Sequence, residues 1–178
     1  MTEAEPRWLN WPNAFTLLRV ALVPVIALLL FADTEAARWW AFAVFVFAAL
    51  TDTVDGWLAR RYVGVTRWGQ LADPAADKAL IVGALAVLAA RGELPWWAVG
   101  VIVLREVAVT VQRSVLVRRG VVMPASALGK VKTVTQVVAV TLYLLPAAPA
   151  ALADVALALA VLVTVVSGLE YALRGGRR

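Results

Sequence analysis

The stretch TDTVDGWLARRYVGVTRWGQLADPAADK, residues 51–78, places four aspartates in a chain that is otherwise rich in alanine, valine and leucine. They are Asp52, Asp55, Asp73 and Asp77. A carboxylate inside an apolar helix, or at its edge, is costly unless an opposite charge compensates it. Side chains can hardly balance all four, so we interpret the stretch as a site for one or two divalent cations.

The composition predicts an integral membrane protein and restricts its chemistry. Of 178 residues, 62% are hydrophobic and the mean hydropathy is +0.81, whereas a soluble domain is about 45–50% apolar. There is no cysteine, which excludes disulfides and thiolate metal sites, and there is no histidine. A general base must therefore be a carboxylate, and an oxygen-rich metal site favours Mg²⁺, Mn²⁺ or Ca²⁺ over zinc. The net charge of +5 suits a surface that faces anionic lipid.

The apolar runs predict an all-α fold with six transmembrane helices in a single domain, residues 1–178. A short interfacial segment, residues 1–12, precedes them. We expect Pro24 to kink the first helix and Asp73 to cap the third, with Pro74 at its first helical position. A polar, basic loop over residues 60–70 should lie before that cap. The six spans are expected at about 14–31, 39–59, 74–90, 95–117, 128–145 and 150–173.

The basic residues predict the orientation of these helices. Six spans place both termini on one side of the membrane, together with the aspartate stretch. Arginine and lysine are concentrated on that side, whereas the other side receives little beyond Arg38 and Arg91. By the positive-inside rule, the termini and the aspartates face the cytoplasm of a multi-pass cell-membrane protein.

Helical spacing groups small residues with the aspartates. Asp52 and Gly56 follow at i, i+4, as do Asp55 and Ala59, so low side-chain bulk lies beside two carboxylates. The other two aspartates are i, i+4 on the next helix, so the pairs can face each other across the loop. Two hard cations held there would neutralise a pyrophosphate as its bond breaks. The alternative is that the aspartates are helix caps and surface charges at the membrane edge.

The spacing D-x2-D-G-x2-A-R-x8-G-x3-D-x3-D, residues 52–77, resembles the signature of the CDP-alcohol phosphotransferase family at all eight positions. The resemblance implies a six-helix membrane enzyme, usually a dimer, that transfers a phosphatidyl group from CDP-diacylglycerol to an alcohol and releases CMP. It also implies that the four aspartates are metal ligands for two ions of Mg²⁺ or Mn²⁺, and that Asp77 is in addition the catalytic base. The residues that it assigns to CDP are Gly56, Ala59, Arg60 and Gly69.

Three flanking stretches indicate the acceptor. NWPNAFTLLRVALVPV, LREVAVTVQR and ALGKVKTVTQ resemble the bacterial phosphatidylglycerophosphate synthases of that family, which implies glycerol 3-phosphate as the acceptor. This dianion needs several cations. The candidates for binding its phosphate are Arg19, Arg105, Arg113, Lys130 and Lys132.

Each of these cations has another interpretation. The two lysines could serve the positive-inside topology alone, and Arg105 with Glu106 could be an internal ion pair that holds helices together. Lys78 directly follows Asp77 and could be a counter-ion for the aspartates.

Two alternative functions remain open at this point. The first keeps the chemistry and changes the acceptor to inositol phosphate, or to phosphatidylglycerol, which would give cardiolipin. The second is a cation channel or transporter with the aspartates as its ion site. Against it, the acids gather at one end of the membrane, and Arg60 with its basic neighbours suits phosphate better than a passing cation.

Overall fold

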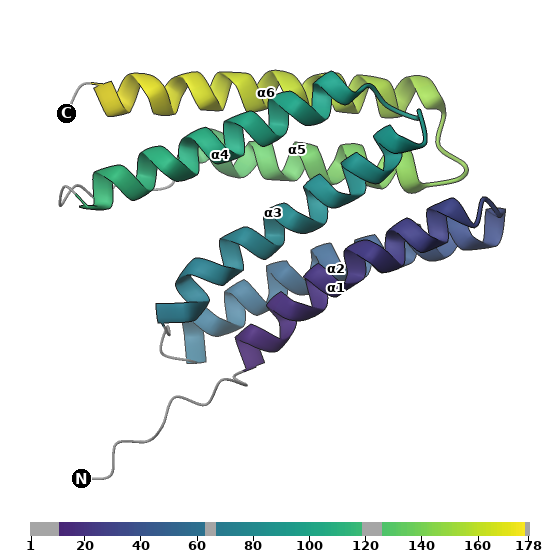
Figure 1. Ribbon diagram of the computed structural model, residues 1–178, viewed down its shortest axis with the longest axis horizontal. Coiled ribbons are helices and arrows are strands. Elements are labelled where there is room, and N and C mark those ends of the chain that lie inside the picture. The colour runs from purple at the N-terminus through teal and green to yellow at the C-terminus, as the bar shows by residue number, and fades with distance from the viewer. Residues whose placement is uncertain (1–10, 63–66, 119–125, 177–178) are drawn as a thin grey trace, which may run out of the picture.

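In the residues that it describes, the computed structural model confirms an all-α fold, with six helices and no strand (Figure 1). It describes the backbone of residues 11–62, 67–118 and 126–176 and the side chains of residues 18–51, 78–117 and 126–173. The predicted interfacial segment therefore lies outside the described residues except for its last two, which begin the first helix. The helices are α1 Trp11–Phe31, α2 Glu35–Tyr62, α3 Arg67–Ala90, α4 Trp96–Arg118, α5 Ala127–Leu144 and α6 Ala150–Gly176.

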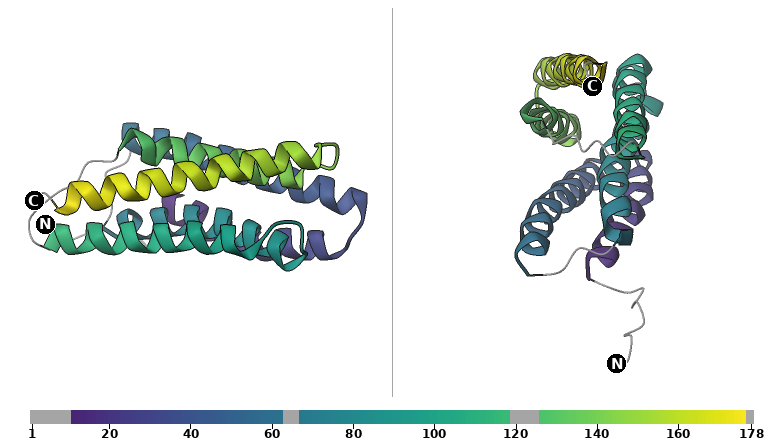
Figure 2. Two further views of the ribbon diagram at one scale, coloured as in Figure 1. Left: turned by 90° about the horizontal axis from the view of Figure 1, so that it is seen from above. Right: turned by 90° about the vertical axis from the view of Figure 1, so that its left-hand side faces the viewer.

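The helices form two layers of three, which Figure 2 shows in its right-hand view. One layer holds α2, α5 and α6, and the other holds α1, α3 and α4. Contacts within the layers join α5 to α6 and to α2, and α3 to α1 and to α4. Contacts between the layers pair α1 with α2, α3 with α5 and α4 with α6. Residues from both layers thus meet along a shared interior.

The interior is built from aliphatic side chains that repeat at helical spacing. Leu80, Leu85 and Leu88 on α3 are at most 2% exposed, and Phe45 on α2 and Ile102 on α4 are equally buried. Burying each such side chain contributes about 1.5–3 kcal/mol. This packing, more than helix propensity, holds the six helices together.

Local signals explain where the second helix begins and correct its predicted start. Thr34 precedes α2, and its Oγ1 accepts a hydrogen bond from the backbone N–H of Ala37 at 3.1 Å. Glu35 adds a negative charge in the first turn. This cap starts α2 at Glu35, four residues before the apolar run at Trp39 from which we predicted it.

The predicted start of the third helix at Asp73 is wrong, because α3 begins at Arg67. Asp73 is therefore not an N-cap, and Pro74 lies within the helix. The predicted loop over residues 60–70 is correspondingly reduced, since α2 continues to Tyr62. An Asp-Pro pair is a local signal, and strong helix formers such as Leu71 and Ala72 before it extend the helix towards the N-terminus.

The two ends of the bundle differ in what they carry. At the signature end lie the last turns of α2, α4 and α6 and the first turns of α1, α3 and α5 (Figure 1). At the opposite end, which we call the turn end, short connections join α1 to α2, α3 to α4 and α5 to α6. The aspartates, the first and last helical residues and the lysines of α5 are therefore all nearer the signature end.

Many apolar side chains point outwards. Leu28, Phe47, Leu104 and Leu173 are between 63% and 74% exposed. Extensive apolar surface of this kind suits lipid or protein contact. By length and hydropathy, one helix among the described residues qualifies as a membrane span, Ala150–Leu173. The apolar segments of α1 and α3 are shorter.

Candidate active site

The aspartate signature lies in the later part of one helix and the earlier part of the next. Asp52 and Asp55 belong to α2, and Asp73 and Asp77 belong to α3. Each pair is separated by about one helical turn. The side chains of residues 52–77 lie outside the described part of the structure. The same holds for the predicted CDP-binding residues, which are Gly56, Ala59, Arg60 and Gly69.

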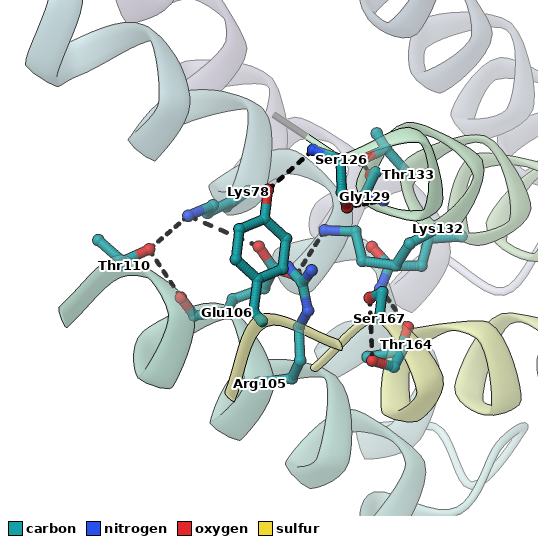
Figure 3. A network of polar contacts seen from close by, with 12 residues as sticks. Lys78, Arg105, Glu106, Thr110, Ser126, Gly129, Lys132, Thr133, Thr164 and Ser167 are labelled. Atoms are coloured by element: carbon teal, nitrogen blue, oxygen red, sulfur yellow. Dashed lines mark hydrogen bonds and ion pairs between the residues drawn. The ribbon is translucent and has the colours of Figure 1, made fainter. Parts of the chain in front are cut away.

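Directly after the signature, the described side chains form a charged group centred on Glu106. We call Lys78, Arg105, Glu106, Thr110 and Lys132 the Glu106 cluster (Figure 3). The Glu106 Oε1 atom lies 2.5 Å from Lys132 Nζ and 3.0 Å from Arg105 Nη1. Its Oε2 atom lies 3.5 Å from Lys78 Nζ, which also donates to Thr110 Oγ1 at 2.6 Å. One carboxylate of α4 thus joins cations from α3, α4 and α5.

The centre of the cluster is buried, Lys78 and Thr110 lie at its exposed edge, and the cluster carries more positive than negative charge. The side chains of Glu106, Lys132 and Arg105 are 8%, 7% and 10% exposed. Three cations therefore share a single carboxylate among the described residues. Such an excess of buried positive charge favours the binding of an anion.

Arg105 has an unused hydrogen-bonding edge. Its Nη1 atom donates to Glu106, whereas Nε and Nη2 are buried without a hydrogen-bond partner in the described part of the chain. A guanidinium edge of two parallel N–H donors matches carboxylate and phosphate oxygens. The ion pair that we kept as an alternative is therefore present, but it uses only part of the Arg105 side chain.

A small cavity opens beside the cluster. Its volume is about 90 Å³. Lys78, Glu106, Lys132, Thr133 and Gln136 supply its polar lining. A polar cavity of this size has room for more than one water molecule.

The predicted acceptor residues fall into separate groups. Arg105 and Lys132 meet at Glu106, and Arg113 shares an aromatic partner with Arg105. Arg19 is 5% exposed on α1, a helix that packs against α2 and α3. Lys130 is exposed in the first turn of α5. Arg105, Arg113 and Lys132 are therefore brought together through shared partners, whereas Arg19 lies on α1, which packs against the two helices that carry the aspartates.

The shared aromatic partner is Tyr171, a residue that the sequence reasoning missed. It is 4% exposed near the end of α6. The only available signal was weak: Tyr171 is the one aromatic residue in a helix made chiefly of alanine, leucine and valine.

A second charged group lies at the turn end. Arg91 donates to the backbone oxygen of Leu30, to Asp33 at 2.5 Å and to Glu93 at 2.6 Å. Arg38 donates to Glu93 at 2.5 Å. The guanidinium of Arg91 hydrogen-bonds to the carboxylate of Asp33 and lowers its pKa. We call Asp33, Arg38, Arg91 and Glu93 the turn-end cluster.

A cavity of about 520 Å³ adjoins this turn-end cluster. Its volume does not make it the active site, because it lies at the end of the bundle remote from the aspartates. In the cluster two arginines face two carboxylates. These charges balance, and the contacts connect α2, the α1–α2 turn and the α3–α4 turn, which indicates a structural role.

The signature region lies within a segment that known proteins share. A model of the CDP-alcohol phosphatidyltransferase family matches residues 9–166. A protein of Mycobacterium tuberculosis named probable phosphatidylglycerophosphate synthase is 46% identical over 173 residues, which cover 94% of this chain and 82% of the relative.

Two further relatives are named as transferases of glycerol 3-phosphate. The CDP-diacylglycerol–glycerol-3-phosphate 3-phosphatidyltransferase of Bacillus subtilis is 41% identical over 179 residues, covering 91% of this chain and 93% of the relative. A protein of that name from Rickettsia bellii is 32% identical over 168 residues, with 91% and 93% covered. The chain belongs to the CDP-alcohol phosphatidyltransferase family.

Proposed function

We propose that this protein is a metal-dependent phosphatidylglycerophosphate synthase. It transfers the phosphatidyl group of CDP-diacylglycerol to sn-glycerol 3-phosphate and releases CMP. The observation that carries this proposal is the 41% identity to the Bacillus subtilis transferase over nearly the whole length of both proteins. The buried excess of positive charge in the Glu106 cluster supports a phosphorylated acceptor.

The four aspartates are the proposed metal ligands. Carboxylate oxygens are the donors that Mg²⁺ and Mn²⁺ prefer, and the chain offers no histidine or cysteine as competitors. Asp52 and Asp55 on α2, with Asp73 and Asp77 on α3, would supply four such donors from two consecutive helices. Bound divalent ions would neutralise the diphosphate and the charge that develops on the leaving CMP.

The small residues of the signature would accept the nucleotide. Gly56 and Ala59 leave the surface of α2 free of bulk, and Gly69 does the same on α3. Arg60 would add a cation next to the diphosphate.

Asp77 is the proposed general base. It would remove the proton from the 1-hydroxyl group of glycerol 3-phosphate, and the oxygen would then attack the β-phosphorus of CDP-diacylglycerol. A new P–O bond forms as the bond to CMP breaks, and CMP keeps that electron pair. The proton then passes from Asp77 to solvent. The diacyl chains would remain in lipid throughout.

The acceptor phosphate would bind at the Glu106 cluster. The unused Nε and Nη2 donors of Arg105 face no hydrogen-bond partner among the described residues and suit two phosphate oxygens. Lys132 and Arg113 would supplement this charge, and Lys130 would attract the dianion at the start of α5. Arg19, on a helix that packs against α2 and α3, would act nearer the diphosphate.

We further propose that all six helices span the cell membrane as one domain and that the protein forms a homodimer. Exposed large apolar side chains on α1, α2, α4, α5 and α6 support this arrangement, because they are suited to lipid contact. Arg38 and Arg91 lie together at the turn end and Lys78 and Arg105 lie near the middle of their helices, whereas the other lysines and arginines of the helices are nearer the signature end. The positive-inside rule then places the signature end in the cytoplasm.

One parallel assay tests the proposed function. Purified protein in detergent with CDP-diacylglycerol and Mg²⁺ or Mn²⁺ is offered glycerol 3-phosphate, inositol 1-phosphate or phosphatidylglycerol, and CMP release is followed. We expect release with glycerol 3-phosphate. Release only with another acceptor refutes the proposed acceptor, and no release with any acceptor refutes the enzyme activity.

A further inference from the structure

Tyr171 contacts both arginines of α4 that we propose for the acceptor phosphate. The guanidinium carbons of Arg105 and Arg113 lie 5.5 Å and 5.9 Å from the centroid of its ring. Both distances are within the range of a cation–π interaction. The backbone oxygen of Tyr171 also accepts a hydrogen bond from Gln112 Nε2 at 3.0 Å. The end of α6 is thereby attached to α4 through the ring and through the backbone.

The hydroxyl group of Tyr171 connects the same residue to α5. It accepts a hydrogen bond from the backbone N–H of Ser126 at 3.1 Å. Ser126 is the N-cap of α5, and its Oγ accepts from the backbone N–H of Gly129 at 3.0 Å. A Cβ atom at Gly129 would lie 3.8 Å from the Tyr171 hydroxyl oxygen, so the helix start packs closely on the ring. This helix start carries Lys130 and Lys132.

The stem of Arg105 lies against the same face of α6. A Cβ atom at Gly168 would approach Arg105 Cγ to 3.1 Å, and Gly168 precedes Tyr171 by one turn. Arg105 is therefore held by α6 along its stem and over the ring, while its Nε and Nη2 donors find no hydrogen-bond partner in the described structure.

An aromatic ring is suited to this task because it carries no net charge. It attracts the guanidinium groups through its quadrupole and leaves the Nε–Nη2 edge of Arg105 available. A carboxylate at this position would order the arginines equally well but would compete with a bound phosphate for the same donors. The tyrosine thus orders the cations without neutralising them.

We infer that Tyr171 is a positioning residue for the acceptor phosphate, an inference that depends on the proposed function. It holds Arg105, Arg113 and the start of α5 in one arrangement around the binding site. The residue lies beyond the segment 9–166 that the family model matches. In this inference, binding of the acceptor depends on a residue of α6 that lies outside that matched segment.

The test compares two substitutions of Tyr171 with one of Tyr143. Tyr171→Phe removes the hydroxyl group and keeps the ring, whereas Tyr171→Leu removes both. Tyr143→Phe is the matched control, because Tyr143 is also buried but donates to Asp154 near the turn end. For each variant, kcat and the KM of each substrate are measured from CMP release.

We expect Tyr171→Leu to raise the KM for glycerol 3-phosphate about tenfold and Tyr171→Phe about threefold. The KM for CDP-diacylglycerol should stay within about twofold of wild type in both variants. Tyr143→Phe should leave both KM values unchanged. Equal rises of the two KM values, or no rise for glycerol 3-phosphate, would overturn the inference, since a purely structural residue gives no such selectivity.

A binding measurement separates this inference from the proposed reaction. The shift in melting temperature with glycerol 3-phosphate gives its affinity without turnover. If wild-type protein binds glycerol 3-phosphate but releases no CMP, the proposed activity fails. The inference still stands in that case if Tyr171→Phe weakens the binding and Tyr143→Phe does not. If glycerol 3-phosphate gives no shift with wild-type protein, the inference fails. If Tyr171→Leu does not fold, Tyr171→Phe decides the outcome.

Discussion

Replacing Glu106 by glutamine should strongly destabilise the protein. The substitution keeps the shape of the side chain and removes the one carboxylate shared by Lys132, Arg105 and Lys78. The first two of these cations are 7% and 10% exposed, so water cannot replace the lost charge. Removing one partner of a buried ion pair costs about 3–5 kcal/mol. We expect about 3 kcal/mol, because Lys78 is partly exposed and a glutamine oxygen still accepts one hydrogen bond.

This loss is measurable as a change in melting temperature in detergent. For a chain of this size, 3 kcal/mol corresponds to a decrease of about 6–12 °C. Glu35→Gln is the matched control, since Glu35 is exposed in the first turn of α2 and should change the melting temperature little. Adding Lys132→Met to Glu106→Gln removes an unpaired buried cation and should restore part of the loss. A decrease of less than about 2 °C for Glu106→Gln would show that the ion pairs of Glu106 do not stabilise the protein as we infer.

Four further results are expected. Asp77→Asn should abolish CMP release while CDP-diacylglycerol binding largely survives, and turnover at the wild-type rate would show that Asp77 is not the base. Chelation with EDTA should stop CMP release and added Mg²⁺ or Mn²⁺ should restore it, so activity that persists without metal contradicts a metal-dependent reaction. Gly83→Ala should destabilise the protein by about 1–3 kcal/mol, because the added Cβ would lie 2.5 Å from Val23 Cγ1. In the same melting measurement, Gly100→Ala should be neutral or slightly stabilising, because its Cβ would meet nothing within 4 Å. Glu93→Gln, in the turn-end cluster, should lower the free energy of unfolding by about 1–2 kcal/mol and leave both KM values unchanged. An altered KM for either substrate would argue against a purely structural role of the turn-end cluster.

The predicted helices show where local sequence signals suffice and where they do not. The number of helices and most of their boundaries follow from apolar runs and from Gly or Pro punctuation, as at Gly92 and Pro95. The start of α3 was mispredicted because Asp73 and Pro74 form a capping signal that the surrounding chain overrides. Caps are worth only about 1 kcal/mol, so a helix that packs well can extend past one.

The sequence by itself determined the family and the position of the aspartates on two consecutive helices. Both depend on spacing along one short stretch, and the helical repeat converts that spacing directly into neighbouring positions. The absence of histidine and cysteine likewise determined, without any structure, that the proposed metal site must be built from oxygen.

Only the tertiary structure decided which charged side chains meet. Lys132 and Glu106 are 26 residues apart in sequence, yet their charged atoms lie 2.5 Å from each other. Tyr171 reaches Ser126, 45 residues earlier, with its hydroxyl oxygen. Such contacts depend on which faces of α4, α5 and α6 turn inwards and on how the two layers are aligned. Those properties arise from the packing of all six helices, so no single stretch of sequence contains them.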